Sequence, residues 1–151
     1  MTMQQKLQAK KSKKGFTLVE LVIVIAILAI LAAIAIPVIT TTINSSKLST
    51  MESDKATVNM LLKEAVNTSK ASIKTTKWGE GKDYTTATVD DVLAYNDLRT
   101  DDAFFTRHIG GEDYTLVWTE KHNVAIQGGE YEETGTPIQG MAITELEPGE
   151  S

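Results

Sequence analysis

The chain has 151 residues, no cysteine and a formal net charge of −5 at pH 7. This length allows one modest domain, and the lack of cysteine excludes disulfides, zinc–thiolate sites and lipid attachment through a thiol. The charge is uneven, since residues 1–15 hold five lysines and no acid while residues 78–151 hold sixteen acids and four bases. An acidic C-terminal part repels nucleic acid, so we predict no direct nucleic-acid partner.

Residues 16–39 are strongly apolar, and residues 21–39 contain no charged side chain. As a helix the segment would measure roughly 36 Å, which is enough to cross a hydrocarbon core of about 30 Å. The basic residues all precede it, at Lys6, Lys10, Lys11, Lys13 and Lys14. The positive-inside rule keeps that end in the cytoplasm, so we predict a single membrane-spanning helix with the rest of the chain exported.

Two residues stand out within this segment. Glu20 places a carboxylate in a membrane-spanning helix, which costs roughly 2.5–3.5 kcal/mol and predicts a functional residue that seeks a positive partner. Pro37 lacks an amide hydrogen and clashes with the carbonyl four residues earlier, so we expect a kink or a local opening of the helix near residues 33–37.

The run Lys14-Gly15-Phe16-Thr17-Leu18-Val19-Glu20, followed by about twenty apolar residues and Pro37, resembles the class III leader and N-terminal helix of type IV pilins and pseudopilins. The resemblance implies cleavage after Gly15 by a prepilin peptidase and methylation of the new amino terminus, Phe16. It also implies that Phe16, Thr17 and Glu20 act in assembly, with Glu20 facing the amino terminus of a neighbouring subunit.

The function implied by this resemblance is structural and not enzymatic, with no catalytic residue and no cofactor. The chain would be a type IV pilus subunit that polymerises through its N-terminal helix into a surface filament for adhesion, motility or biofilm formation. Its partners would be other copies of itself, the prepilin peptidase, the pilus assembly platform and its ATPase, and the membrane before assembly. It would be a single-pass membrane protein first and part of an extracellular pilus afterwards.

Two alternatives remain open. The first is a pseudopilin of a type II secretion or DNA-uptake system, which uses the same assembly chemistry. The second is an exported protein with an ordinary signal peptide, for which Ala33-Ile34-Ala35 supplies a cleavage pattern that would make Ile36 the first mature residue. The second alternative leaves Glu20 and Gly15 unexplained.

Beyond the apolar span, a second helical segment is predicted over residues 40–77. Apolar residues recur there at helical spacing, at Met51, Val58, Leu62, Ala65 and Ile73. We expect Trp78-Gly79-Glu80-Gly81 to end the helix. The predicted organisation is therefore a leader at 1–15, a membrane and polymerisation helix at 16–39, an amphipathic helix at 40–77 and an acidic head at 78–151.

A head of this size needs the amphipathic helix as part of its core, because it has neither disulfide nor metal. In chain order we predict a short strand at 84–87, a helix that begins near Thr88 and carries Val92, Leu93 and Leu98, a hairpin of strands 114–119 and 123–127, and a third strand at 141–146. The face formed by Tyr114, Leu116 and Trp118 should cover the helix. The predicted class is α+β, a long N-terminal helix packed on a small antiparallel sheet, as in pilins.

The other candidate sites are weak. His108 and His122 lack ligand spacing, and Asp101-Asp102 and Glu130-Tyr131-Glu132-Glu133 lack the alternating oxygen pattern of a calcium loop, so we predict no metal site. Gly110-Gly111 and Gly128-Gly129 read as turns. The sequons at Asn44 and Asn67 are short patterns that arise by chance.

Overall fold

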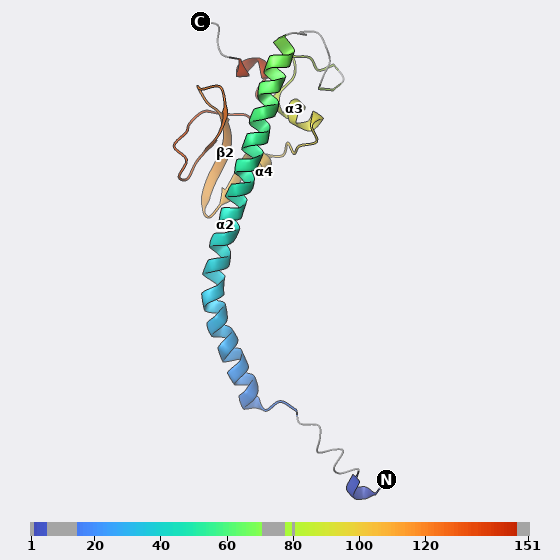
Figure 1. Ribbon diagram of the computed structural model, residues 1–151, viewed down its shortest axis with the longest axis vertical. Coiled ribbons are helices and arrows are strands. Elements are labelled where there is room, and N and C mark those ends of the chain that lie inside the picture. Colours follow the sequence, from blue (N-terminus) through green and yellow to red (C-terminus); the bar gives the residue numbers. More distant parts are fainter. Residues whose placement is uncertain (1, 6–14, 71–77, 80, 148–151) are drawn as a thin grey trace. The chain divides into compact units, whose positions relative to one another are not determined.

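The computed structural model describes residues 2–5, 15–70, 78–79 and 81–147, and for residues 68–70 it describes the backbone alone. The longest element is the helix α2, Leu18–Lys70, which contains Pro37 (Figure 1). The part of the predicted amphipathic helix at 71–77 lies outside the described residues.

The chain divides into two compact units, Met1–Thr42 and Ile43–Ser151. In the first unit, α2 exposes its apolar side chains along its whole length, as detailed below. In the second unit, the remainder of α2 contributes Met51, Val58, Leu62 and Ala65 to the core, each at most 2% exposed. The predicted apolar face of this helix is thereby confirmed, apart from Ile73, which lies outside the described residues. The domain boundaries proposed at residues 15, 39 and 77 stay predictions.

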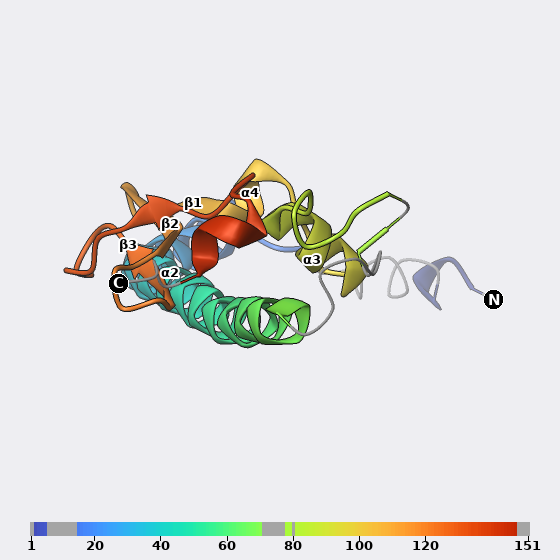
Figure 2. The same cartoon turned by 90° about the horizontal axis from the view of Figure 1, so that it is seen from above.

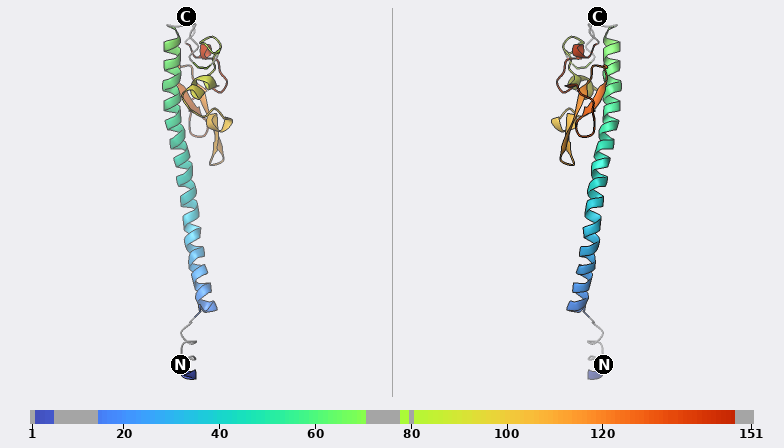
Figure 3. Two further views of the ribbon diagram at one scale, coloured as in Figure 1. Left: turned by 90° about the vertical axis from the view of Figure 1, so that its right-hand side faces the viewer. Right: turned by 90° about the vertical axis from the view of Figure 1, so that its left-hand side faces the viewer.

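A four-stranded antiparallel sheet forms the centre of the second unit. Its strands are β1 Thr106–Ile109, β2 Glu112–Trp118, β3 Val124–Gln127 and β4 Thr136–Pro137, in the order β1-β2-β3, and β4 also pairs with β2. The predicted hairpin corresponds to β2 and β3, with Leu116 opposite Ile126. Seen from the side, the sheet lies on one side of this part of α2 (Figure 3).

The predicted packing of the sheet on the helix is confirmed. Tyr114, Leu116 and Trp118 belong to the same buried cluster as Met51 and Val58 of α2. In addition, the backbone N–H of Val124 donates to the Asn59 side chain at 3.0 Å, which joins β3 to the helix. The expected α+β class is therefore correct.

The helix predicted near Thr88 is α3, Val89–Tyr95, which lies at the other end of the unit from β3 (Figure 2). Thr88 and Asp91 form a reciprocal capping box. Leu98 lies outside the helix, contrary to the prediction, because Asp97 adopts a positive φ of 59° and the N–H of Leu98 turns back to the Leu93 carbonyl. This arrangement is a Schellman ending, which terminates a helix.

Two predicted strands are wrong. Residues 84–86 form a turn, because the Asp83 carboxylate accepts hydrogen bonds from the backbone N–H groups of Thr85 and Thr86 at 2.9 and 3.1 Å. Local side-chain bonds of this kind compete with a strand. The predicted third strand contains instead the 3₁₀ helix η1, Ile143–Leu146, with only Ala142 bridged to Thr88.

Two strands, β1 and β4, were not predicted from the sequence. β1 pairs with β2 across the two-residue turn Gly110-Gly111, whose φ angles are 64° and 89°. Positive φ at both positions is the requirement of the tightest hairpin turns, and glycine meets it without strain. The predicted turns at Gly110-Gly111 and Gly128-Gly129 are both present.

The C-terminal segment is held to the unit without a disulfide. The N–H of Val89 donates to the Met141 carbonyl at 2.8 Å, and the N–H of Ile143 donates to the Ala87 carbonyl at 3.1 Å. Met141, Ile143 and Leu146 are buried. Paired backbone and buried apolar side chains thus fix this segment where a cross-link is lacking.

Candidate functional site

The peptide bond between Gly15 and Phe16 lies outside regular structure. Residues 15–17 are not helical, and Phe16 is 92% exposed. A Cβ added at Gly15 would meet no atom within 4 Å, so the fold of this chain does not require glycine there. Any need for glycine at this position must therefore come from an interacting protein.

Two residues set the start of α2. The Thr17 N–H donates to Oε2 of Glu20 at 2.9 Å, and the Glu20 N–H donates to Oγ1 of Thr17 at 3.2 Å. The first i to i+4 bond of the helix runs from the Leu21 N–H to the Thr17 carbonyl at 3.2 Å. This reciprocal pattern is a capping box, in which Thr17 is the N-cap and Glu20 the third helical residue.

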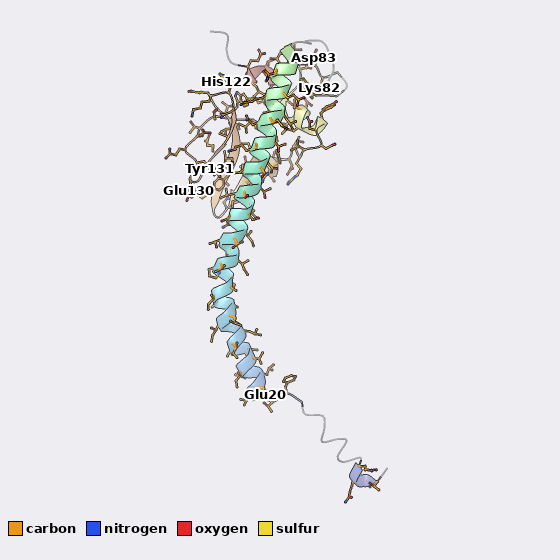
Figure 4. All side chains as sticks on the ribbon, viewed as in Figure 1. Glu20, Lys82, Asp83, His122, Glu130 and Tyr131 are labelled. Carbon is orange, nitrogen blue, oxygen red and sulfur yellow. The ribbon has the colours of Figure 1, made fainter. Side chains whose placement is uncertain are left out.

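The capping box changes the description of Glu20. The sequence predicts a carboxylate that seeks a positive partner, and in the structure this carboxylate already accepts a hydrogen bond from the Thr17 N–H of its own first turn. Figure 4 shows Glu20 at the N-terminal end of α2. The sequence could have predicted this capping box, because Thr17-Leu18-Val19-Glu20 has the T-x-x-E spacing that is typical of one.

Among the described residues of their unit, no other side chains cover the apolar side chains that follow. Sixteen large apolar side chains between Phe16 and Ile39 are exposed, with exposed fractions of 49–92%. By length and composition, α2 is able to cross a membrane. A helix that is apolar all round is stable where lipid or other helices surround it.

Pro37 lies inside α2, and the helix runs through it without a break. On the C-terminal side, the hydroxyls of Thr40, Thr41 and Thr42 donate to carbonyls three or four residues earlier, at 2.6, 2.9 and 2.9 Å. These hydroxyls therefore need no water, which suits an apolar surrounding. The kink expected at Pro37 stays a prediction.

The remaining candidate residues do not converge on a site. Nδ1 of His108 lies 2.8 Å from the Asp113 carboxylate, and His122 occupies the loop between β2 and β3. Asp101 pairs with Arg99. Among the described residues, no three metal-binding side chains of the His, Cys, Asp or Glu type lie together.

Comparison with known proteins identifies one region of the chain. A family model described as the prokaryotic N-terminal methylation motif matches residues 10–36. The matched range includes Gly15, Phe16, Thr17 and Glu20, so the match confirms the resemblance drawn from these residues. No curated protein and no solved structure matches the chain at the significance required.

Proposed function

We propose that this chain, which its N-terminal methylation motif places among the type IV pilins and pseudopilins, is a structural subunit of a type IV pilus. The leader implies a membrane-anchored precursor that is processed by a prepilin peptidase. In the proposal the peptidase cuts after Gly15, Phe16 becomes the methylated amino terminus, and copies polymerise through the helix of residues 16–39. The second unit then covers the outside of the filament.

One observation carries the proposal, namely that a processing motif directly precedes a helix whose apolar side chains lack cover. Burial of each large apolar side chain away from water is favourable by roughly 1.5–3 kcal/mol of free energy. Sixteen exposed side chains of this kind hold the precursor in the bilayer. Once the helix leaves the bilayer, the same side chains require the helices of neighbouring copies around them.

The geometry of the processing site supports the same proposal. The Gly15–Phe16 bond lies two residues before the first helical residue, Leu18, and Phe16 is exposed. A peptidase needs a peptide bond whose carbonyl and N–H are free of helical hydrogen bonds. The alternative cleavage after Ala35 falls in the middle of α2, where the backbone is helical.

A pseudopilin remains the second candidate, because both classes share the leader and the helix. The two differ in what they build, since a pilus is a long surface fibre of one major chain and a pseudopilus is a short piston. Fibres sheared from cells that express the chain at its natural level separate them. A pilus subunit is the principal component of such fibres, whereas a pseudopilin is absent from them.

The variant Gly15→Val tests the proposal. No described residue lies within 4 Å of a side-chain carbon added at this position, so the second unit should fold as before. We expect the precursor to keep its leader and surface fibres to disappear, as seen by mass spectrometry and electron microscopy. Normal fibres built from uncut precursor would refute the proposal.

A further inference from the structure

We propose that the second units of neighbouring copies join through ion pairs, in which a groove bordered by both arginines of the chain receives the acidic loop of residues 130–133 of another copy. The inference rests on the proposed function, because it names a contact within the proposed filament. It adds a contact between heads to the packing of the apolar helices. Its basis is the charge and the position of two surfaces of the second unit.

The groove lies between α2, the short helix α4, Asp102–Phe105, and the strand β1. Its volume is about 590 Å³, and the buried side chain of Phe104 forms part of its wall. Three basic side chains line it, each from a different part of the fold, namely Lys47, Arg99 and Arg107. Two acidic side chains line it as well, Asp54 and Asp97. The groove therefore has an excess of positive charge, although residues 78–151 as a whole are strongly acidic.

Each base of the groove can donate to a further carboxylate. Nε and Nη2 of Arg99 donate to Asp101, and Nη2 of Arg107 donates to Asp54. A guanidinium carries five N–H donors in a planar fork, so both arginines retain N–H groups for a second acceptor. Among the described residues, no acidic side chain forms a salt bridge with Lys47. The groove is thus suited to a segment that carries several carboxylates.

The loop between β3 and β4 presents three exposed carboxylates, on Glu130, Glu132 and Glu133. Tyr131 anchors this loop, since its ring packs edge-on against Tyr114 of β2 with the ring centres 6.0 Å apart. Figure 4 shows Tyr131 next to Glu130. The loop also passes so close to β2 that a Cβ at Gly129 would lie 2.3 Å from the Tyr114 hydroxyl. The fold therefore holds these carboxylates in a defined position.

The acids of the loop are available for a partner. Glu133 lies 3.9 Å from Nζ of Lys121, and both side chains are exposed. Neither Glu130 nor Glu132 forms a salt bridge with any of the described residues. The loop thus offers the negative charges that the groove lacks.

The groove and the loop lie at the same level of the second unit. The groove contacts α2 at Lys47, Thr50 and Asp54, and the loop borders a second hollow that contacts α2 at Ser45 and Leu48. In the sheet, β2 separates β1, which borders the groove, from β3, which leads into the loop. Figure 2 shows β3, β2 and β1 in this order, with α4 beyond β1. The loop therefore lies on the other side of the unit from the groove.

Two complementary surfaces on different sides of one unit form a heterologous interface, which generates an open helical array when the rotation between copies does not close a ring. Each added copy leaves one groove and one loop free for the next. Copies that point the same way, as in the proposed filament, present both surfaces at the same level. Complementary charges fix the register of an interface more than they add affinity, so we assign this contact to the alignment of neighbouring heads.

Carbodiimide cross-linking of purified fibres tests the contact, because this reagent joins a lysine amine to a carboxylate only where the two touch. Two variants are co-expressed. The first keeps Lys47 and carries Glu130→Gln and Glu132→Gln. The second keeps both glutamates and carries Lys47→Arg, which retains the positive charge. A peptide that joins Lys47 to Glu130 or Glu132 can then form only between two copies.

We expect this joined peptide, identified by mass spectrometry, in wild-type fibres and in fibres of the co-expressed variants. Each variant expressed alone should lack it. Its absence from wild-type fibres, or its presence there and absence from the co-expressed pair, would overturn the inference. Linkage of Lys47 to a different protein in place of the loop would overturn it as well.

Charge reversal supplies a second measurement, which a folding defect does not imitate. The groove variant carries Lys47→Glu and Arg99→Glu, and the loop variant carries Glu130→Lys and Glu132→Lys, all at exposed positions. Each variant alone brings like charges together and should lose most of its fibres. Co-expression should restore the fibres, because each groove then meets a loop of opposite charge on the other variant. Full fibre yield from either variant alone, or no recovery on co-expression, would contradict the contact.

A failure of the proposed function is distinguishable from these results. It would appear before any cross-link is made, as sheared wild-type fibres that do not contain this chain or as a chain that keeps its leader.

Discussion

Glu20 serves the chain both as a hydrogen-bond acceptor and as a negative charge, and two substitutions separate these properties. Glutamine at the same position still completes a capping box, but alanine does not. In the proposed mature chain, both variants leave the Phe16 amino group without a carboxylate at residue 20, and an uncompensated charge of a buried pair typically costs about 3–5 kcal/mol.

We therefore predict that Glu20→Gln and Glu20→Ala both fail to form fibres, while only Glu20→Gln keeps the helix start. Fibre yield is counted by electron microscopy, and the helix start is followed by amide hydrogen exchange at residues 18–21 in micelles. Full fibre yield from Glu20→Gln would show that the charge is dispensable.

Arg107 makes the main polar contact between β1 and α2. Its guanidinium pairs with Asp54, and the two side chains are only 16% and 27% exposed. It also lies over the Phe104 ring, 5.6 Å from the ring centre. Hydrogen bonds between partly buried charged groups are worth about 1.5–3 kcal/mol.

Arg107→Ala is accordingly expected to lower the free energy of unfolding by about 1.5–3 kcal/mol, measured by urea denaturation of the full chain in detergent. The matched control is Arg99→Ala, since the Arg99–Asp101 pair is exposed, with side-chain fractions of 67% and 48%. An exposed pair contributes little to stability, because water and salt screen it. Equal losses from the two variants would contradict this ranking.

At the scale of single residues, the sequence predicted features whose residues lie close together along the chain and missed a contact between residues far apart in it. Gly15, Phe16 and Glu20 could be proposed as processing and assembly residues because their pattern is local. The role of Thr17 as N-cap was equally local and was missed. The pairing of Arg107 with Asp54, 53 residues apart, has no signal in a single sequence.

Among the elements, α3 shows how a short helix depends on its cap. Thr88 and Asp91 exchange hydrogen bonds, and the Thr88 N–H donates to Asp91 Oδ2 at 2.9 Å. Burial raises the pKa of Asp91, but the hydrogen bonds from Thr88 and the positive charge of the nearby Lys82 lower it by more. The net shift of this pKa is therefore downward. The ionised carboxylate is thus the form that stabilises the helix start.

Replacement of Thr88 by alanine should lower the free energy of unfolding by about 0.5–2 kcal/mol, while replacement by serine should leave it nearly unchanged. Because the pKa of Asp91 is lowered on folding, this contribution is present above the ordinary aspartate pKa and is lost as the pH falls below it. Urea denaturation at neutral and acid pH measures both effects. A Thr88→Ala loss that is independent of pH would contradict the role given to Asp91.

The elements predicted correctly are those with several agreeing local signals. For α2 these were length and helical spacing, for α3 a capping box, and for β2 and β3 alternation around a polar loop. The failures at 84–87 and 141–146 concern short segments whose strand-like composition was overridden, in one case by the Asp83 carboxylate and in the other by packing of Ile143 and Leu146. Short apolar runs do not distinguish strand from helix.

At the scale of the whole molecule, the two units differ in what they expose. The first exposes apolar side chains, whereas the second buries a core drawn from α2, the sheet, α3 and the C-terminal segment. The sequence predicted that the head would need the helix for its core, because the head alone has too little apolar content. It did not predict that the C-terminal segment would pair with residues 87–89.

Two tyrosines make the second unit sensitive to alkali. Burial, together with the neighbouring carboxylates Glu147 and Glu52, raises the pKa of Tyr84 and of Tyr131 to about 12. Both hydroxyls are therefore neutral in the folded state at a pH where the unfolded chain ionises them. Their stabilising contribution is complete below pH about 10 and is lost as the pH rises from about 10 to about 12.

We predict that the absorbance of ionised tyrosine rises in this range together with the loss of folded signal. Tyr131→Phe removes one of the two groups and should reduce the dependence on pH. Ionisation of all four tyrosines below pH about 10.5, without unfolding, would contradict the raised pKa given to Tyr84 and Tyr131.

The most direct test of the account is the amino terminus of the chain in fibres sheared from the cell surface, determined by intact mass and peptide sequencing. The account predicts a chain that begins with N-methylated Phe16 and is the principal component of those fibres. A chain that retains Lys14 and Gly15, or that begins at Ile36 after loss of the apolar span, would contradict it.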